Sequence, residues 1–252
     1  MRLLILGGTT EASGLARLLA DVPRHDAVLS LAGRTAAPRA QPIKTRVGGF
    51  GGADGLAQWL TSERIDAVID ATHPYADEIS RNAVAACTQI RIPLVSIVRP
   101  PWQAQAGDRW ENVPDAVSAA RTLGTTPRHV FLSLGRQELN VFAMAPQHHY
   151  LARSVEAPSP SGLPPDLIVM QARGPFDRTA ELALLKREKI EIVVSKNSGG
   201  SATYAKIEAA RELGLPVVMM ARPDKQAGHV VTSPQVALDW IDQLAPRSPR
   251  GV

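Results

Sequence analysis

The sequence predicts an α/β protein made of two similar halves, each with a parallel β-sheet between two layers of helices. The first observation is an internal repeat, because residues 65–100 and residues 190–223 follow the same pattern. The second is that short apolar runs alternate along the chain with segments of helical periodicity. This alternation is typical of parallel sheets whose strands are joined by helical crossovers.

The repeat has two matching parts, and the first is the more informative. In each copy an apolar strand breaks into a polar loop that contains Gly or Pro, at 65–74 in the first copy and at 190–199 in the second. Further on, 92–95 and 215–218 match as strands, and each is followed by an Arg-Pro pair, at 99–100 and 222–223. Loops at the carboxyl ends of parallel strands are where α/β proteins hold ligands, so each half has a candidate ligand edge.

In the first half, four-residue to six-residue apolar runs predict strands, and apolar residues every three or four positions predict helices. The first helix, for example, carries Leu15, Leu18 and Leu19 on one face. In order we expect strand 3–6, helix 10–20, strand 27–32, strand 46–48, helix 53–63, strand 67–71, helix 76–89, strand 93–98 and helix 115–123. Residues 100–112 read as a connecting loop.

The same criteria apply to the second half, which begins after turn residues at 124–127. We expect strand 130–134, helix 137–143, strands 149–153 and 167–171, helix 179–189, strand 192–195, helix 203–213, strand 216–221 and helix 235–244. The predicted domains are therefore 1–125 and 126–252. Right-handed crossovers between parallel strands make both domains Rossmann-like three-layer structures, with a ligand cleft expected between them.

Composition narrows the class of protein. With 252 residues and a net charge of +4, the chain is long enough for two domains and suggests an anionic partner. It has neither a Lys/Arg run nor an aromatic stacking pattern, so a nucleic-acid partner is not expected. Cys87 is the only cysteine, and the apolar run 3–6 is too short for a signal peptide or membrane span. We expect a soluble, cytoplasmic protein without a membrane partner.

The loop after the first strand is the first candidate site. Gly7, Gly8, Thr9, Thr10 and Glu11 join a buried strand to a helix, which directs backbone N–H groups and the positive end of the helix dipole at a bound anion. A dinucleotide phosphate would suit this loop. The alternative is a tight turn in which Thr10 caps the helix.

The end of the second strand indicates which dinucleotide. NAD-binding folds usually carry an acidic residue there, whereas this chain has Arg34 and Thr35. Arg34 can pair bidentately with a 2′-phosphate and Thr35 can donate to it, which favours NADPH over NADH. A solvated surface arginine is the alternative interpretation.

Four motifs together resemble the precorrin-6A reductases of cobalamin biosynthesis, over nearly the whole chain. The motifs are Gly7 to Glu11, Asp70-Ala-Thr-His-Pro-Tyr-Ala76, Ser195-Lys-Asn-Ser-Gly199 and Arg222-Pro223. The resemblance implies an NADPH-dependent reduction of one double bond in precorrin-6A, giving precorrin-6B. Related enzymes act on the cobalt-containing equivalent, and the motifs do not separate the two. The resemblance thus implies precorrin-6A as the partner, together with other corrin-pathway enzymes for substrate hand-over.

Particular residues follow from these motifs. Asp70, Thr72 and His73 are candidates for contacting the cofactor, and His73 is also a candidate proton donor or a structural residue of the turn. Candidate substrate ligands are Tyr75, Arg99, Lys196, Asn197, Ser198, Gly199 and Arg222. Lys196 is also a candidate catalytic residue. Arg153 and Lys225 are further strand-end cations that suit a polycarboxylate, although any one could be a capping or surface residue.

The remaining histidines share no ligand spacing, so no metal site is expected. Two other classes of function stay open. One is an NADPH oxidoreductase that acts on another anionic substrate, and the other is a non-catalytic protein that senses a dinucleotide.

Overall fold

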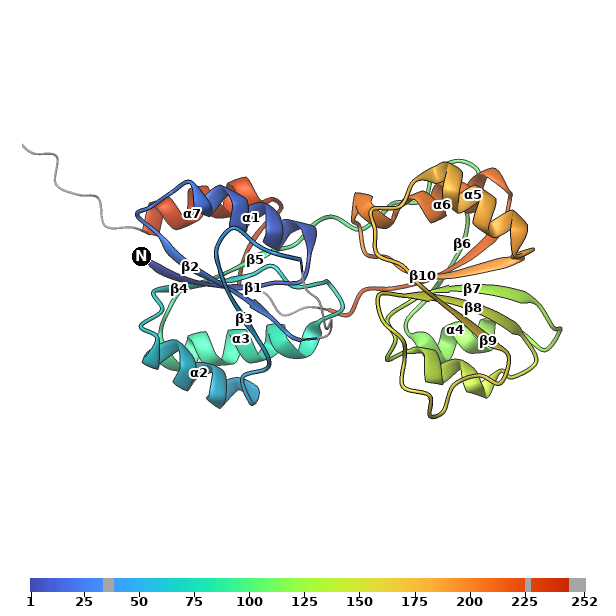
Figure 1. Cartoon of the computed structure of the whole chain (residues 1–252), viewed down its shortest axis with the longest axis horizontal. Helices are drawn as coiled ribbons and strands as arrows, with labels where there is room; N and C mark the ends of the chain where they lie inside the picture. The colour runs from blue at the N-terminus through green and yellow to red at the C-terminus, as the bar shows by residue number, and fades with distance from the viewer. Residues whose placement is uncertain (34–38, 225–227, 245–252) are drawn as a thin grey trace, which may run out of the picture. The chain divides into compact units, whose positions relative to one another are not determined.

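The computed structural model describes residues 1–33, 39–224 and 228–244, and it divides into two compact units (Figure 1). The first unit contains residues 1–100 and 224–252, and the second contains residues 101–223. Each has one six-stranded sheet, and every strand pair within it is parallel. The predicted α/β class and the parallel sheets are confirmed.

The first unit has the strand order β12-β5-β4-β1-β2-β3. Its strands are β1 (Arg2–Leu6), β2 (Asp26–Leu31), β3 (Lys44–Val47), β4 (Ala67–Asp70), β5 (Leu94–Ile97) and β12 (His229–Val231). Its helices are α1 (Thr10–Ala20), α2 (Gly52–Ser62), α3 (Asp77–Ile90) and α7 (Pro234–Leu244).

The second unit has the strand order β6-β11-β10-β7-β8-β9. Its strands are β6 (Arg109–Val113), β7 (His129–Ser133), β8 (His149–Ser154), β9 (Leu167–Gln171), β10 (Ile192–Lys196) and β11 (Pro216–Met220). Its helices are α4 (Ala116–Thr122), α5 (Arg178–Arg187) and α6 (Ala205–Glu212), with 3₁₀ turns η1 (Leu139–Met144) and η2 (Ser201–Thr203).

The two sheets have the same order once β1 to β5 are matched with β7 to β11, so the repeat in the sequence corresponds to equivalent strands. The sixth strands are exchanged. β6 follows β5 along the chain but completes the second sheet, and β12 follows β11 but completes the first. The chain passes between the units next to Pro100 and next to Pro223, the ends of the two repeated Arg-Pro pairs.

This exchange changes the expected boundary. A division after residue 125 would place β6 and α4 in the first domain, whereas their contacts lie in the second unit. Residues 100–112 were expected to be a loop, but 109–112 form most of β6. β12 was not expected at all, and the predicted helix 137–143 is the 3₁₀ turn η1.

Alternating residues of the central strands build two cores in each unit. On β1, Leu3 and Ile5 pack with α1 and α7, whereas Leu4 and Leu6 pack with α2 and α3. Figure 1 shows these helix pairs on opposite faces of the first sheet. In the second unit Val130 and Leu132 face α4 and η1, while Phe131 faces α5 and α6. Both sheets are thus covered on both faces, which leaves the carboxyl ends of the strands for ligands.

Candidate functional site

The loop between β1 and α1 depends on two adjacent glycines. Gly7 donates its backbone N–H to the Ser30 carbonyl at 2.9 Å, and a Cβ on Gly7 would lie 2.6 Å from Cδ1 of Leu29. Gly8 has φ +114°, and a Cβ placed there would meet no atom within 4 Å. The loop therefore packs closely on its inner side and leaves open space beside Gly8.

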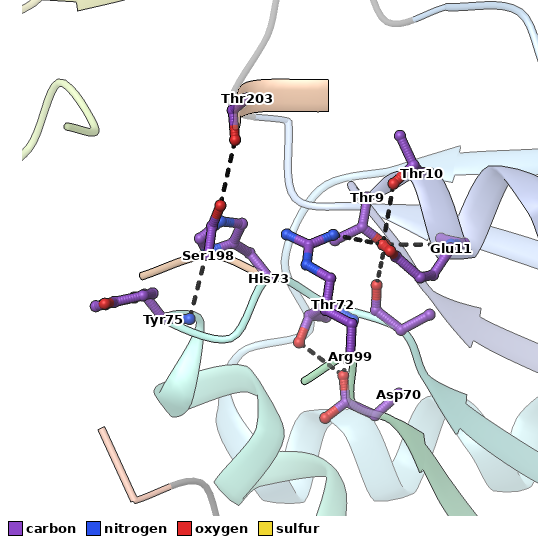
Figure 2. A network of polar contacts seen from close by, with 12 residues as sticks. Thr9, Thr10, Glu11, Asp70, Thr72, His73, Tyr75, Arg99, Ser198 and Thr203 are labelled. Atoms are coloured by element: carbon purple, nitrogen blue, oxygen red, sulfur yellow. Dashed lines mark hydrogen bonds and ion pairs between the residues drawn. The ribbon is translucent and has the colours of Figure 1, made fainter. Parts of the chain in front are cut away.

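Thr9 holds this loop in place. Its hydroxyl accepts a hydrogen bond from the Ala12 N–H at 3.1 Å, which makes Thr9 the N-cap of α1. The same hydroxyl donates to the Ala71 carbonyl at 2.6 Å, and so joins the loop after β1 to the loop after β4 (Figure 2). The helix cap considered from the sequence is thus present, but the capping residue is Thr9 and not Thr10.

Glu11 and Arg99 form an ion pair beside the loop (Figure 2). The Arg99 guanidinium lies 2.6 Å from the Glu11 carboxylate, and only 14% and 19% of the two side chains are exposed. Thr10 donates a further hydrogen bond to Glu11 at 3.1 Å. Burial raises the pKa of Glu11, but the hydrogen bond and charge of Arg99 outweigh it and the pKa is lowered. Arg99, which was predicted to bind the substrate, is therefore paired with Glu11, which was predicted to bind the cofactor.

The loop after β4 is ordered by its own side chains. Asp70 is buried and accepts hydrogen bonds from the Thr72 N–H at 3.0 Å and from the Thr72 hydroxyl at 2.7 Å. Nδ1 of His73 accepts from the Tyr75 N–H at 3.3 Å, so a neutral His73 carries its proton on Nε2. The two rings lie 5.6 Å apart between centroids (Figure 2).

The matching edge of the second unit carries a cation paired with a carboxylate. Lys196 ends β10 and forms an ion pair with Glu138, which follows β7. A Cβ on Gly135 would lie 2.7 Å from Oε2 of Glu138, so the glycine makes room for the pair. Glu138 was not singled out from the sequence, although it lies within the expected helix 137–143, four positions before Phe142.

The side chain of Asn197 holds the backbone at Trp102, close to where the chain enters the second unit. Its side-chain oxygen accepts from the Trp102 N–H at 2.7 Å, and its side-chain N–H donates to the Trp102 carbonyl at 3.0 Å. Nε of Arg222 donates to the Asn197 carbonyl at 2.7 Å. Ser198 lies 3.3 Å from the Thr203 hydroxyl, and Gly199 has φ +71°. The side chain of Asn197 is thus hydrogen-bonded to the protein backbone at Trp102.

Arg153 is buried and paired with a carboxylate, whereas its place at a strand end led us to expect a cation that binds a ligand. It is 7% exposed and pairs with Glu181 through both oxygens, one of them at 2.9 Å from Nη2. Lys206, which the sequence did not single out, is 2% exposed and donates to the Thr203 carbonyl at 2.7 Å. Burial, with the nearby charge of Arg153, lowers the pKa of Lys206 to about 7.

The structure thus assigns the predicted residues to two edges. Gly7 to Glu11, Asp70, Thr72, His73, Tyr75 and Arg99 lie in the first unit, and Lys196 to Gly199 and Arg222 lie in the second. Arg34, Thr35 and Lys225 fall outside the described residues. Within the described ranges, no group of three or more His, Cys, Asp or Glu side chains is arranged to hold a metal ion. No helix described here is both long and apolar enough to cross a membrane.

Two doubly wound parallel sheets, each with a loop-bearing carboxyl edge, define a Rossmann-like α/β protein with two units. Residues 2–242 match the family described as precorrin-6x reductase CbiJ/CobK. The chain belongs to this family, and the resemblance carried by the four motifs is confirmed.

Relatives and a solved structure agree with this membership. A precorrin-6A reductase of Rhodobacter capsulatus is 50% identical over 100% of this chain and 99% of its own. One from Sinorhizobium sp is 52% identical over 97% and 94%, and a cobalt-precorrin-6A reductase of Priestia megaterium is 29% identical over 92% and 94%. The structure of a CobK precorrin-6A reductase covers 100% of both chains, with 50% identity and a TM-score of 0.91.

Proposed function

We propose that this protein reduces one double bond of the precorrin-6A macrocycle with NADPH and gives precorrin-6B, in cobalamin biosynthesis. The observation that carries the proposal is the family match over residues 2–242, together with 50% identity to a precorrin-6A reductase over the whole chain. Both carboxyl edges carry the polar residues that such a reaction needs.

The first unit suits the dinucleotide. The backbone at Gly8 adopts a φ that favours glycine, and the space beside it admits a phosphate against the start of α1. Glu11 stands in the first turn of that helix, where its carboxylate would repel a phosphate. Arg99 neutralises it at 2.6 Å, so the loop keeps its attraction for an anion. Arg34 and Thr35, which follow β2 in the sequence, are proposed to bind the 2′-phosphate.

The second unit suits the macrocycle, whose peripheral carboxylates require cations and backbone donors. Lys196 is held at the end of β10 by Glu138, and Ser198 and Gly199 follow it. We place Arg222 and Tyr75 among the substrate ligands as well. The ion pair with Glu138 fixes where the Lys196 ammonium group lies at this edge.

The reduction also needs a proton for the carbon next to the one that is reduced. NADPH supplies the hydride when it is bound. His73 is the proposed proton donor: it would act as the imidazolium, whose Nε2 would deliver the proton and leave a neutral ring, and the contact of Nδ1 with the Tyr75 N–H orients the ring. The turn at His73 to Tyr75 fixes the orientation of the ring.

A cobalt-free substrate is the better choice of the two that the motifs leave open. Relatives named precorrin-6A reductase are 41–52% identical to this chain, and relatives named cobalt-precorrin-6A reductase are 27–29% identical. Incubation of the protein with precorrin-6A and NADPH without oxygen tests the reaction. NADPH absorbance should fall together with the change in the chromophore, and the product should be heavier by two hydrogens. NADPH binding without any change of the chromophore would contradict the proposal.

Two substitutions should distinguish the role of the carboxyl edge of the first unit from that of the second. Lys196→Ala is expected to raise the KM for precorrin-6A about tenfold or more, because a charge-assisted contact of about 1.5–3 kcal/mol is lost, and to leave the Kd of NADPH unchanged. Lys186→Ala, on the exposed face of α5, is the matched control. His73→Ala should lower turnover while both ligands still bind. If Lys196→Ala abolishes NADPH binding, the assignment of the cofactor to the first unit alone is wrong.

A further inference from the structure

The second unit has a hollow with a volume of about 520 Å³. It lies where α5 and α6 begin, next to the loop that follows β10 and to the segment that Asn197 holds. Aromatic, charged and hydroxyl side chains line it, among them Trp102, Phe176, Arg178, Ser201, Tyr204 and Glu208. The hollow is therefore at the carboxyl edge of the second sheet, the edge that also carries Lys196.

Three aromatic rings form its apolar walls, and the structure holds them firmly. Asn197 binds both backbone groups of Trp102, at 2.7 and 3.0 Å. The Trp102 and Tyr204 rings lie 5.4 Å apart between centroids, and the Tyr204 hydroxyl accepts from Arg211 at 2.7 Å. Arg211 is itself paired with Asp108. Rings that are fixed before a ligand arrives lose little conformational entropy on binding.

Two of the rings have a buried basic side chain against one face. The guanidinium carbon of Arg153 lies 3.6 Å from the centroid of Phe176, and Nζ of Lys206 lies 5.0 Å from the centroid of Trp102. Both basic side chains are buried, at 7% and 2% exposure, and neither lines the hollow, whereas both rings do. The Arg153 guanidinium on one face of Phe176 attracts the negative charge of that ring, which makes the other face more favourable for an electron-rich conjugated system. Lys206 acts in the same way on Trp102 when it is protonated.

The polar part of the lining suits carboxylates more than cations. Arg178 begins α5, and α6 begins at Ala205 without a side-chain cap on its N-terminus. Ser201 adds a hydroxyl group, and Gly199 lets a ligand approach the backbone. Glu208 is the acidic residue of the lining, and Arg178 also pairs with Glu212. The hollow thus combines stacking surfaces with one arginine and with the start of α6, whereas the start of α5 is already capped by the Asp177 carboxylate.

We propose that this hollow binds one edge of a conjugated, carboxylated tetrapyrrole, with a ring of the macrocycle against Phe176 and Trp102. This inference rests on the proposed function, and it names the part of the second unit that recognises the substrate. The edge that enters the hollow brings its carboxylates to Arg178 and to the start of α6, and the rest of the macrocycle extends out of it.

Two variants test the proposal, Phe176→Leu and Trp102→Leu, since leucine keeps apolar bulk and removes the aromatic face. The matched control is Phe50→Leu in the first unit, because Phe50 also has an arginine over its ring, with Arg46 at 3.9 Å. Titration with precorrin-6A in the absence of NADPH, followed through the chromophore, should show binding about 3- to 10-fold weaker in each of the two variants. The control should bind as the wild type does, and the Kd of NADPH should stay the same in all three.

The outcomes separate this proposal from the proposed function. If both variants bind precorrin-6A as tightly as the wild type and still reduce it, the hollow is not a substrate site. The proposed reaction is then unaffected. A weaker Kd for NADPH instead shows that the hollow belongs to the dinucleotide and also overturns the proposal. If the wild type reduces no precorrin-6A, uroporphyrin is titrated as an inert carboxylated tetrapyrrole, and weaker binding in both variants still supports the hollow. Should Phe176→Leu fail to fold, Trp102→Leu decides the result.

Discussion

Single cations near the ends of strands are paired with carboxylates from other elements. Arg99 pairs with Glu11, Arg153 with Glu181 and Lys196 with Glu138, and the partners stand 88, 28 and 58 positions away along the chain. The sequence shows the cations, because a strand-end position can be read from the apolar pattern. It does not show their partners, which depend on how distant elements pack. Arg153 was therefore expected at the ligand edge, whereas Glu181 holds it inside.

Arg34 is the residue that we propose selects the dinucleotide. Arg34→Ala should weaken NADPH binding by about 10- to 100-fold, because a charge-assisted contact of about 1.5–3 kcal/mol is lost. NADH binding should change little, because NADH lacks the 2′-phosphate. Titration of both dinucleotides into the wild type and the variant measures the preference. An unchanged preference would mean that Arg34 is not the 2′-phosphate ligand.

Lys206 gives the stability of the protein a specific pH dependence. Burial lowers its pKa from 10.5 to about 7 in the folded state, while the unfolded chain keeps the ordinary value. Between these two values the unfolded chain binds more protons, so this group makes the folded state more stable as the pH rises. Below about pH 7 both states are protonated and the contribution no longer changes.

Comparison with Lys206→Met isolates this contribution, because methionine has a similar length and does not titrate. The free energy of unfolding of the wild type minus that of the variant should rise with pH from about 7 to about 10, by at most about 1.4 kcal/mol per pH unit. Urea unfolding at several pH values measures it. A difference that is flat or falls over this range would show that Lys206 stays charged in the folded protein.

Loops and helix starts determine the site at the scale of single elements. α1 begins at its place because Thr9 caps it, and the same hydroxyl holds the loop after β4. The glycines and threonines of this loop are visible in the sequence, so a ligand loop could be predicted there. Which threonine is the cap could not, because Thr9 and Thr10 are adjacent and equally suitable by residue type.

Thr9→Val tests the double role of the hydroxyl, since valine has the same shape without the polar group. We expect a loss of about 1–2 kcal/mol in the free energy of unfolding, because a cap and a second hydrogen bond are removed. NADPH binding should weaken too, because the loop that we propose binds the phosphates is loosened. Thr9→Ser, which keeps the hydroxyl, is the control and should remain near the wild type. Equal stability of the two variants would count against the capping role.

Edge strands explain where the sequence failed to predict the fold. The central strands are buried on both faces, so their apolar runs are clear and the repeat is visible in them. β6 reads Arg-Trp-Glu-Asn-Val and β12 only His-Val-Val, and both lie at the edges of their sheets, where burial is partial. These are the two exchanged strands. Weak patterning at the edges therefore hid the exchange and led to a boundary after residue 125.

At the scale of the whole molecule, the exchange makes the first unit depend on the last part of the chain. α7 buries Ala237, Leu238 and Ile241 in the core that contains Leu15 and Leu19 of α1, and β12 covers the edge of β5. A protein ending at Pro223 loses these contacts, although residues 1–100 are intact. The second unit keeps all of its strands in such a protein.

Truncation after Pro223 should therefore unfold the first unit and spare the second. A fragment of residues 1–125 should also fail to fold stably, because it lacks β12 and α7 and carries β6 without its partner β11. NADPH binding should be lost in both proteins, and the fluorescence of Trp59 in α2 should report exposure to water. Truncation after Leu244 is the matched control, because it retains α7 and should leave NADPH binding unchanged. If the 1–125 fragment folds cooperatively and binds NADPH, the first half is independent of the exchanged strand, and the contacts of β12 and α7 contribute little to its stability.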